Sequence, residues 1–579
     1  MFKPQGKHST DQSTNSVSRR TFLKLIGVSL GSSALLTACA PVAAPAAVAP
    51  AAAPTTAPVV EAAAPASAVD GMMRPGGTPK RGGTLRTAFG VTTAHYDMHQ
   101  GGSASVLTHM YNNLVRLNLV DGLQTIIPDL ATSWDVAPDG LTYTFHLREG
   151  VKFHDGVVFS ADDVVATFNR IINPPEGIVI PFKNDMAMVS SVEAVDPMTV
   201  KFTLNSPRAY FLTMLTGTNM IIYSKATLEA NNNDLREVQV APGTGAFKFV
   251  EYKTAEKWTL ERNPDYWDSE LPYLDKIEMI HVAAWSDRGT AVLTDQADLS
   301  WNVSFETWSE GEKNPDDVQV KKLANFGAYW MLINTKKEPF GDARVRRAIH
   351  LGISRQNIIK AFGTQEQINL TRWMPYGDPY ATAPEEIAKL PGYREDKTAD
   401  IEEAKKLLAD AGFPDGIKDV EILAASGPQA ELLATAIQDM LKRNLNIEAT
   451  IRIIERAQLP EEEKAGNFTL VIDTPAGPSI SDMAPPANNW WRTGGASNWG
   501  GYSNPAFDTL LDQIDVEIDV AKRQDLINQA LDLLDQDVPW FLIGFTYHLP
   551  MWRTKLKGTG LELRTFALWS RLETAWIDA

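Results

Sequence analysis

Apolar and polar residues repeat with two different periods in the first third of the chain. From Leu141 to Leu147 every second residue is apolar, and this period of two is typical of a half-buried strand. Residues 160–172 instead place apolar side chains every three or four positions and stop before two prolines. We therefore expect a strand and then a helix, with Ser160 as its N-cap and Asp163 completing a capping box.

A second helical pattern lies much later in the chain. Apolar residues recur at helical spacing between Asp400 and Ala411, and Gly412 and Pro414 follow as stop signals. Here we expect Asp400 to be the N-cap. Strand and helix patterns of both kinds are mixed throughout the sequence, which predicts an α/β or α+β fold with several sheets.

The N-terminus carries a short apolar run that is typical of an export signal. Leu23–Leu36 is diluted by glycine and serine and is shorter than the roughly 20 apolar residues that span a bilayer. Basic residues precede it and small residues follow it. Ser18–Lys24 resembles a twin-arginine signal, and Leu36–Cys39 resembles a bacterial lipobox, in which the cysteine carries the lipid. We expect residues 1–38 to be removed and Cys39 to be lipidated.

The segment after Cys39 is almost all alanine, proline, valine and threonine up to residue 70. Repeated prolines forbid a regular helix there, so we interpret 39–81 as a lipidated cysteine with a semi-rigid tether. Cys39 is the single cysteine of the 579-residue chain, so no disulfide can form within it. The remainder must be stabilised by a large core.

The part of the chain from Gly82 to Ala579 is longer than one hydrophobic core normally supports, and no segment of it is apolar enough to cross a membrane. The formal net charge of the whole chain is −17. Such an acidic balance argues against nucleic acid and against anionic lipid surfaces as partners.

Residues 130–171 carry an ordered set of motifs, which run from Trp134 through Asp139-Gly140, Phe145, Leu147-Arg148, Gly150, Phe153 and Asp155-Gly156 to Ala161-Asp162-Asp163-Val164. This set resembles the signature of family 5 extracytoplasmic solute-binding proteins, the oligopeptide, dipeptide and nickel receptors of ABC importers. Further segments follow in the family's order, namely Gly82–Leu85, Pro242–Tyr252, Arg262–Trp267, Phe340–Ile358 and Tyr502–Gln513. Within Pro242–Tyr252, Ala246 stands where the family usually has proline.

The resemblance implies a bilobal periplasmic-binding-protein fold of the α/β class, in which two crossing strands form a hinge and the ligand binds between the lobes. Lobe I would comprise 82–124, 240–335 and 546–579, lobe II would comprise 336–545, and 125–239 would be an inserted subdomain. A ligand that touches both lobes binds the closed form better and shifts the population toward it.

The sequence lacks the common motifs of an enzyme. From Gly82 onward it contains no Gly-Lys-Ser/Thr P-loop ending, no Gly-x-Ser-x-Gly and no His-Glu-x-x-His, so we expect neither catalysis nor a cofactor, and we expect the ATPase to be another chain. His95 and His99 have the i,i+4 spacing of a metal pair. We favour a structural role for them in the loop after the first strand, and for His154 a role in a turn, and we expect no metal site.

Tryptophan gives the lead on the solute, because indole rings pack against sugars, peptide side chains and cations. Six tryptophans fall in segments that the family places along the cleft: Trp301, Trp330, Trp373, Trp490, Trp491 and Trp499. Asp482, with Asp473 as the second choice, resembles the aspartate that binds a peptide's amino terminus. The arginine that grips a dipeptide's carboxylate is absent from residues 427–433, and Arg372 is a candidate substitute.

The sequence thus predicts the solute-binding component of an ABC importer that captures an oligopeptide or a similarly bulky solute and delivers it to a permease. We expect a monomer held by its lipid on the outer face of the bacterial cytoplasmic membrane, on the periplasmic side. Two alternatives stay open. One is an oligosaccharide receptor of the same family, and the other is a ligand sensor for a signalling partner.

Overall fold

The computed structural model describes residues 78–90, 92, 93, 95–119, 125–361, 368–375, 378, 380–476, 482–561 and 571–578. The signal sequence, Cys39 and the tether lie outside the described residues. None of the described helices is both long and apolar enough to cross a membrane.

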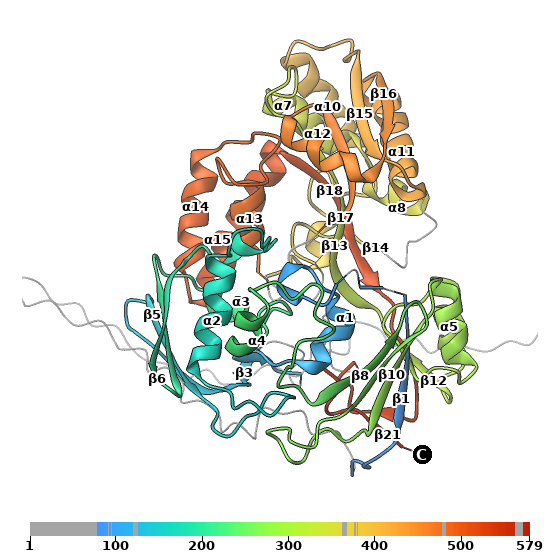
Figure 1. The fold of residues 1–579 in the computed structure, drawn as a ribbon. Helices are drawn as coiled ribbons and strands as arrows, with labels where there is room; N and C mark the ends of the chain where they lie inside the picture. The colour runs from blue at the N-terminus through green and yellow to red at the C-terminus, as the bar shows by residue number, and fades with distance from the viewer. Residues whose placement is uncertain are drawn as a thin grey trace, which may run out of the picture. The chain divides into compact units, whose positions relative to one another are not determined.

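A seven-stranded sheet collects strands from three distant parts of the chain (Figure 1). Its order is β12 (Val318–Val320), β19 (Met551–Arg553), β11 (Leu299–Ser300), β1 (Thr84–Phe89), β10 (Lys276–His281), β9 (Lys257–Arg262) and β8 (Phe247–Lys253). β1 pairs in parallel with β10 and β11. Helices α5 (Trp285–Leu293) and α6 (Phe305–Glu312) pack against the sheet, α5 on β1, β11 and β19 and α6 on β12. The buried core of this sheet includes Leu85, Trp258 and Ile277.

A second sheet of six strands has the order β14 (Ile368–Asn369), β18 (Trp540–His548), β13 (Leu323–Ile333), β17 (Leu470–Ala476), β15 (Val420–Ala425) and β16 (Ala449–Ile454). The helices around it are α7 (Ala343–Gly352), α8 (Arg355–Ala361), α10 (Thr398–Asp410), α11 (Pro428–Leu445) and α12 (Leu459–Ala465) (Figure 1). Met331, Ile349 and Ile422 belong to its buried core.

The long strands β13 and β18 join the two sheets. They pair antiparallel from Leu323 opposite His548 to Leu332 opposite Trp540. β13 follows β12 after two residues, and β18 leads into β19 after two residues, so each continues into a strand of the seven-stranded sheet. This arrangement is the predicted two-strand hinge of a mixed α/β, bilobal fold.

A four-stranded sheet of order β4 (Ala131–Val136), β5 (Thr142–Leu147), β7 (Thr199–Leu204) and β6 (Val189–Asp196) lies in the predicted inserted subdomain, with α2 (Ala161–Ile172) packed on it. Burial alternates residue by residue along β5, which confirms the predicted strand. The capping box is also confirmed. Ser160 is the N-cap of α2, and its backbone N donates to Oδ2 of Asp163 over 2.8 Å.

The predicted N-cap at Asp400 is wrong. α10 begins at Thr398, and Asp400 lies inside its first turn, fully buried. Its carboxylate accepts hydrogen bonds from the Gly392 backbone N and from Lys397 Nζ, at 2.9 and 2.6 Å. The side chain of Asp400 therefore holds the loop before the helix in place. In the sequence, an aspartate with this role cannot be told apart from an N-cap.

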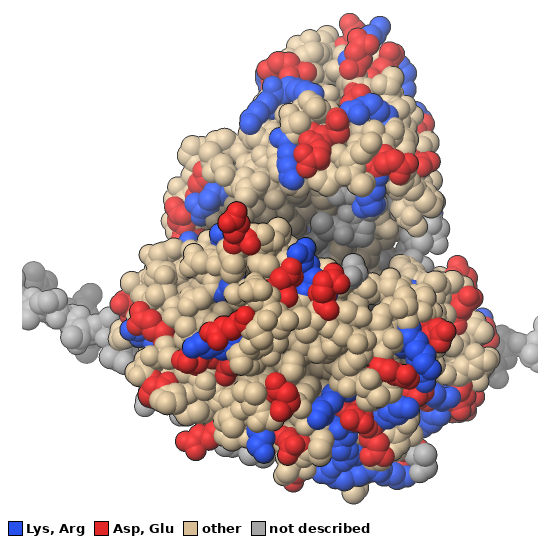
Figure 2. Space-filling view, viewed as in Figure 1, with Lys and Arg blue, Asp and Glu red and all other residues tan. Residues whose placement is uncertain are grey.

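The remaining elements connect these sheets. They are α1 (Ala104–Leu107), β2 (Val115–Leu117), β3 (Ile126–Pro128), α3 (Phe211–Leu215), α4 (Lys225–Ala230), α9 (Pro384–Ile387), α13 (Ala484–Trp490), α14 (Pro505–Val516), α15 (Val520–Asp537), β20 (Leu556–Lys557) and β21 (Trp576–Ile577). On the face in Figure 2, acidic and basic side chains are interspersed.

Candidate functional site

Four of the six predicted tryptophans lie together next to the hinge strands. The Trp330 ring, on β13, lies 4.4 Å from that of Trp540 at the start of β18. Trp490 stacks on Trp540 at 5.2 Å, and Trp373 meets Trp491 edge to face at 4.6 Å. We call these five residues the tryptophan cluster. Trp540 was not predicted, since its strand gives no sign of which rings it faces.

The cluster offers an uneven surface to a ligand. Trp330, Trp373 and Trp491 are at most 6% exposed, whereas Trp490 is half-buried. Three of the rings therefore help to pack the core, and Trp490 is the predicted ring that keeps an accessible face.

The other two predicted tryptophans occupy different places. Trp301 follows β11 and is buried in the core of the seven-stranded sheet, with Trp258 and Trp552. Trp499 is half-buried and packs against the same core as the tryptophan cluster.

Asp482 lies in a closed polar arrangement. Both of its carboxylate oxygens accept from Arg523 Nη2, at 2.7 and 2.8 Å, and Oδ1 also accepts from the Ala484 backbone N at the start of α13. The side chains of Asp482 and Arg523 are 8% and 3% exposed. The predicted amino-terminal anchor thus already has a cationic partner inside the protein. The side chain of Asp473 lies outside the described residues.

Arg372 is also occupied within the protein. Its guanidinium donates to Asp535 Oδ2 at 2.9 Å and to Asp532 Oδ1 at 2.7 Å, and the side chain is 5% exposed. This double pairing ties the segment after β14 to α15. It leaves Arg372 poorly suited to replace the missing carboxylate-binding arginine.

Of the two histidines that could suggest a metal pair, His99 has a structural role. The His99 ring is fully buried, and its Nε2–H donates to the Ile221 carbonyl at 3.1 Å while Nδ1 accepts from Arg170 at 2.9 Å. Burial, and then Arg170, lower its pKa to about 3. His154 Nε2 pairs with the Gly245 carbonyl at 2.9 Å in a turn. Within the described ranges, no three His, Cys, Asp or Glu side chains gather around a metal position.

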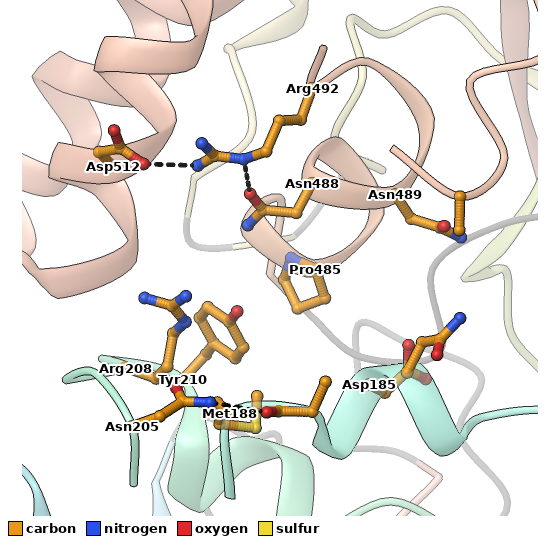
Figure 3. A pocket seen from close by; sticks show the side chains of 13 residues that line it. Asp185, Met188, Asn205, Arg208, Tyr210, Pro485, Asn488, Asn489, Arg492 and Asp512 are labelled. Carbon is orange, nitrogen blue, oxygen red and sulfur yellow. Dashed lines mark hydrogen bonds and ion pairs between the residues drawn. The ribbon is translucent and has the colours of Figure 1, made fainter. Parts of the chain in front are cut away.

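A cavity of about 560 Å³ lies between the predicted inserted subdomain and helices α13 and α14 (Figure 3). Side chains from the two regions face one another across it: Asn184, Asp185, Met188, Asn205, Arg208 and Tyr210 on one side, and Pro485, Asn488, Asn489, Arg492 and Asp512 on the other. Sequence reasoning missed this cavity, because its walls are about 300 residues apart in the chain.

The two sides of this cavity meet at Asp515, the buried residue near the end of α14. Its carbonyl accepts from the Ala209 backbone N at 2.8 Å, and its carboxylate accepts from Asn488 Nδ2 at 2.9 Å. Arg208 Nη1 lies 3.5 Å from the same carboxylate. Burial raises the pKa of Asp515, although these neighbours partly offset the shift.

The family profile of bacterial extracellular solute-binding proteins, family 5 (middle), matches residues 125–498. The chain belongs to this family. Its solute-binding role agrees with the hinged, bilobal fold described above.

Individual relatives span most of the chain. Heme-binding protein A of Haemophilus influenzae is 30% identical over 78% of this chain and 84% of its own length. Di/tripeptide-binding protein 2 of Pseudomonas aeruginosa is 28% identical over 78% of this chain and 86% of its own length. Among solved structures, the ABC transporter-associated periplasmic binding protein DppA of Helicobacter pylori, in complex with the peptide STSA, has a TM-score of 0.70 at 29% identity, covering 86% of this chain and 99% of that one.

Proposed function

We propose that this protein is the solute-binding component of an ABC importer, and that it captures a peptide or a similarly bulky solute between its two lobes. The observation that carries the proposal is the pair of hinge strands, β13 and β18, which join two separately cored sheets. A rotation about these two strands leaves both of these cores intact, and a ligand that binds both lobes favours the closed state. A permease and an ATPase would be separate chains.

Relatives support the class of solute. The Pseudomonas relative is named for di- and tripeptides, and the Helicobacter structure holds a peptide. The tryptophan cluster beside the hinge supplies an accessible apolar face at Trp490, and an indole face can hold side chains of many shapes. We propose Trp490 as the ring of the cluster that contacts ligand and the other four rings of the cluster as its supports. No catalytic step is part of this proposal.

A ligand screen tests the proposal. Purified protein is screened by thermal shift against peptide and oligosaccharide libraries, since a ligand at 100 times its Kd stabilises the folded state by about 2.7 kcal/mol. We expect peptides to raise the melting temperature, and small-angle scattering with the best peptide to show a smaller radius of gyration. A response to oligosaccharides alone would make the peptide assignment wrong. An unchanged scattering profile with a bound peptide would contradict hinge closure.

Oligosaccharide remains the second candidate, because stacked indole rings also bind the apolar faces of sugars. A ligand sensor would bind in the same way, and the two roles differ in whether cells that lack the protein lose solute uptake.

We also propose the domain boundaries stated above, export through the twin-arginine signal, a lipid on Cys39, and a monomeric protein outside the cytoplasmic membrane. The export signal and the lipid rest on sequence motifs, because residues 1–77 lie outside the described part of the chain, and the domain boundaries rest on the family resemblance.

A further inference from the structure

The cavity between the inserted subdomain and α13 is distinct from the tryptophan cluster in its chemistry. The tryptophan cluster is apolar, whereas the cavity is lined by two arginines, two aspartates and four asparagines. Its volume of about 560 Å³ falls in the range of small-molecule sites. The question is which of its polar groups are already satisfied within the protein.

Arg492 and Asp512, at the rim of the cavity, already form an ion pair with each other. Arg492 Nη2 lies 2.8 Å from Asp512 Oδ1, and its Nε donates to Asn488 Oδ1 at 2.5 Å (Figure 3). The charges of Arg492 and Asp512 therefore cancel each other, and the Asn488 amide is used on both sides, since its Nδ2 donates to Asp515.

Arg208 is satisfied only in part. One nitrogen, Nη1, donates to the Pro207 carbonyl at 3.1 Å and lies 3.5 Å from the Asp515 carboxylate. That carboxylate also accepts from Asn488 and lies 3.8 Å from Arg492. Nε and Nη2 of Arg208 have no hydrogen-bond partner within the described ranges. A guanidinium has five N–H donors, so this one retains a fork for an incoming carboxylate.

Asp185 supplies the opposite charge. Its side chain is half-buried on the wall of the cavity, in the short 3-10 turn before β6. Across the described part of the chain, no cation or hydrogen-bond donor reaches its carboxylate. Burial raises its pKa to about 6, so it is still mainly ionised at neutral pH, and a cationic partner would relieve the cost of its burial.

Neutral groups complete the lining. The side-chain amides of Asn184 and Asn489 and the Tyr210 hydroxyl also lack hydrogen-bond partners among the residues that the structure describes, and all three line the cavity. Asn184 is exposed, Asn489 is half-buried and Tyr210 is buried. The polar groups of Asn489 and Tyr210 favour a ligand that both donates and accepts hydrogen bonds.

We propose that this cavity is a second ligand site, for a small zwitterion of amino-acid or dipeptide size, with the ligand's carboxylate on Arg208 and its ammonium on Asp185. Asp185 has no counter-charge among the described residues, and Arg208 keeps two nitrogens without a partner there beside its 3.5 Å ion pair with Asp515, so a zwitterion meets both groups, whereas a simple anion or cation meets one. Because the lining comes from both the inserted subdomain and α13, an occupant favours the arrangement in which these regions meet.

The test is calorimetric titration of the purified protein with L-alanine, L-alanyl-L-alanine, succinate and putrescine. We expect at least one of the two zwitterions to bind, and succinate and putrescine to bind at least about tenfold more weakly. Arg208→Gln and Asp185→Asn should each weaken the zwitterion by about tenfold to a hundredfold, since each removes a charged hydrogen bond. Arg208→Lys should restore part of the affinity that Arg208→Gln loses.

Matched controls come from the exposed ion pair of Lys201 and Glu193, 2.8 Å apart on β7 and β6 of the same subdomain. Lys201→Gln and Glu193→Gln should leave zwitterion binding unchanged. Melting curves of all variants establish that each is folded.

Three outcomes would overturn the inference: no binding of either zwitterion, equally tight binding of succinate or putrescine, or zwitterion binding that is unchanged in Arg208→Gln and Asp185→Asn. In the last case the zwitterion binds elsewhere, and the proposed peptide site is untouched. Conversely, loss of zwitterion binding in these variants while a screened peptide still binds would separate the two sites.

Discussion

At the scale of single residues, two of the buried carboxylates of this protein form tight pairs with buried arginines. Asp97 and Arg170 are buried together at 0% and 1% side-chain exposure, and Asp482 and Arg523 are nearly as enclosed. A buried charge that loses its partner is costly, because neither water nor another group then solvates it. These pairs therefore make clear predictions.

Changing Asp482→Asn should lower the free energy of unfolding by about 3 kcal/mol, because Arg523 would stay buried without a counter-charge. Chemical denaturation measures this change. The control is Asp512→Asn, which breaks the pair with Arg492 at a side chain that is 71% exposed and should cost less than about 1 kcal/mol. If Asp482→Asn leaves stability unchanged but weakens peptide binding, Asp482 is a ligand anchor and not a structural residue.

His99 predicts how stability depends on pH. Its folded-state pKa of about 3 lies below the usual 6.5, so the unfolded chain takes up the proton first as the pH falls. The stabilisation is complete above about pH 6.5 and is lost as the pH falls toward 3. The stabilisation that is lost between pH 7.5 and pH 5 amounts to about 2 kcal/mol.

Denaturation at these two pH values should show a smaller acid loss in His99→Gln than in the wild type. His146 is an exposed histidine on β5, and His146→Gln serves as the control. An equal pH dependence in His99→Gln and the wild type would contradict the assignment of a buried, neutral His99.

At the scale of elements, the glycines before β8 allow this part of the chain to pack closely on the backbone of Met110. A Cβ on Gly243 would lie 2.0 Å from the Met110 carbonyl oxygen, and one on Gly245 would lie 2.4 Å from the Met110 carbonyl carbon. The segment from Pro242 to Ala246 can therefore pack directly on backbone. This contact explains the Gly-Thr-Gly motif in physical terms.

Gly245→Ala should destabilise the protein by about 3 kcal/mol, because the added methyl group meets backbone that cannot move aside. Gly341→Ala is the matched control, since its Cβ would first meet the tip of the flexible Glu338 side chain at 3.1 Å. Thermal melting gives the melting temperatures of the two variants, and we expect the lower one for Gly245→Ala. Equal melting temperatures would show that the strand can shift to admit the methyl group.

At the scale of the whole molecule, two sheets with separate cores are joined by one pair of strands, so a rotation about these strands leaves both of these cores intact. A lipid anchor would keep the protein close to a permease in the membrane. The predicted lipid on Cys39 would provide this, because each buried methylene contributes about 0.8 kcal/mol of membrane affinity.

Cys39→Ser should release the protein from the membrane fraction of expressing cells into the soluble extracytoplasmic fraction. Immunoblots of the two fractions measure the shift, with a Ser33→Ala variant in the signal as the control for unaltered export. Continued membrane association of Cys39→Ser would contradict the lipobox interpretation.

The sequence by itself determined the local elements and the family. The alternation of Leu141–Leu147 and the capping box of Ser160 and Asp163 involve neighbours in the chain, so their physics is complete within a few residues. The resemblance of its motifs to the family predicted the hinge and the bilobal fold.

Only the tertiary structure decided which distant groups meet. It placed Asp400 inside a helix, because Gly392 and Lys397 converge on its carboxylate, and it paired Asp482 with Arg523 and Arg372 with Asp535. A carboxylate's partner depends on what lies within about 4 Å in space, and spacing along the chain does not encode that distance. The tryptophan cluster and the cavity between the inserted subdomain and α13 also bring together residues that are distant in the chain, so only the tertiary structure could reveal them.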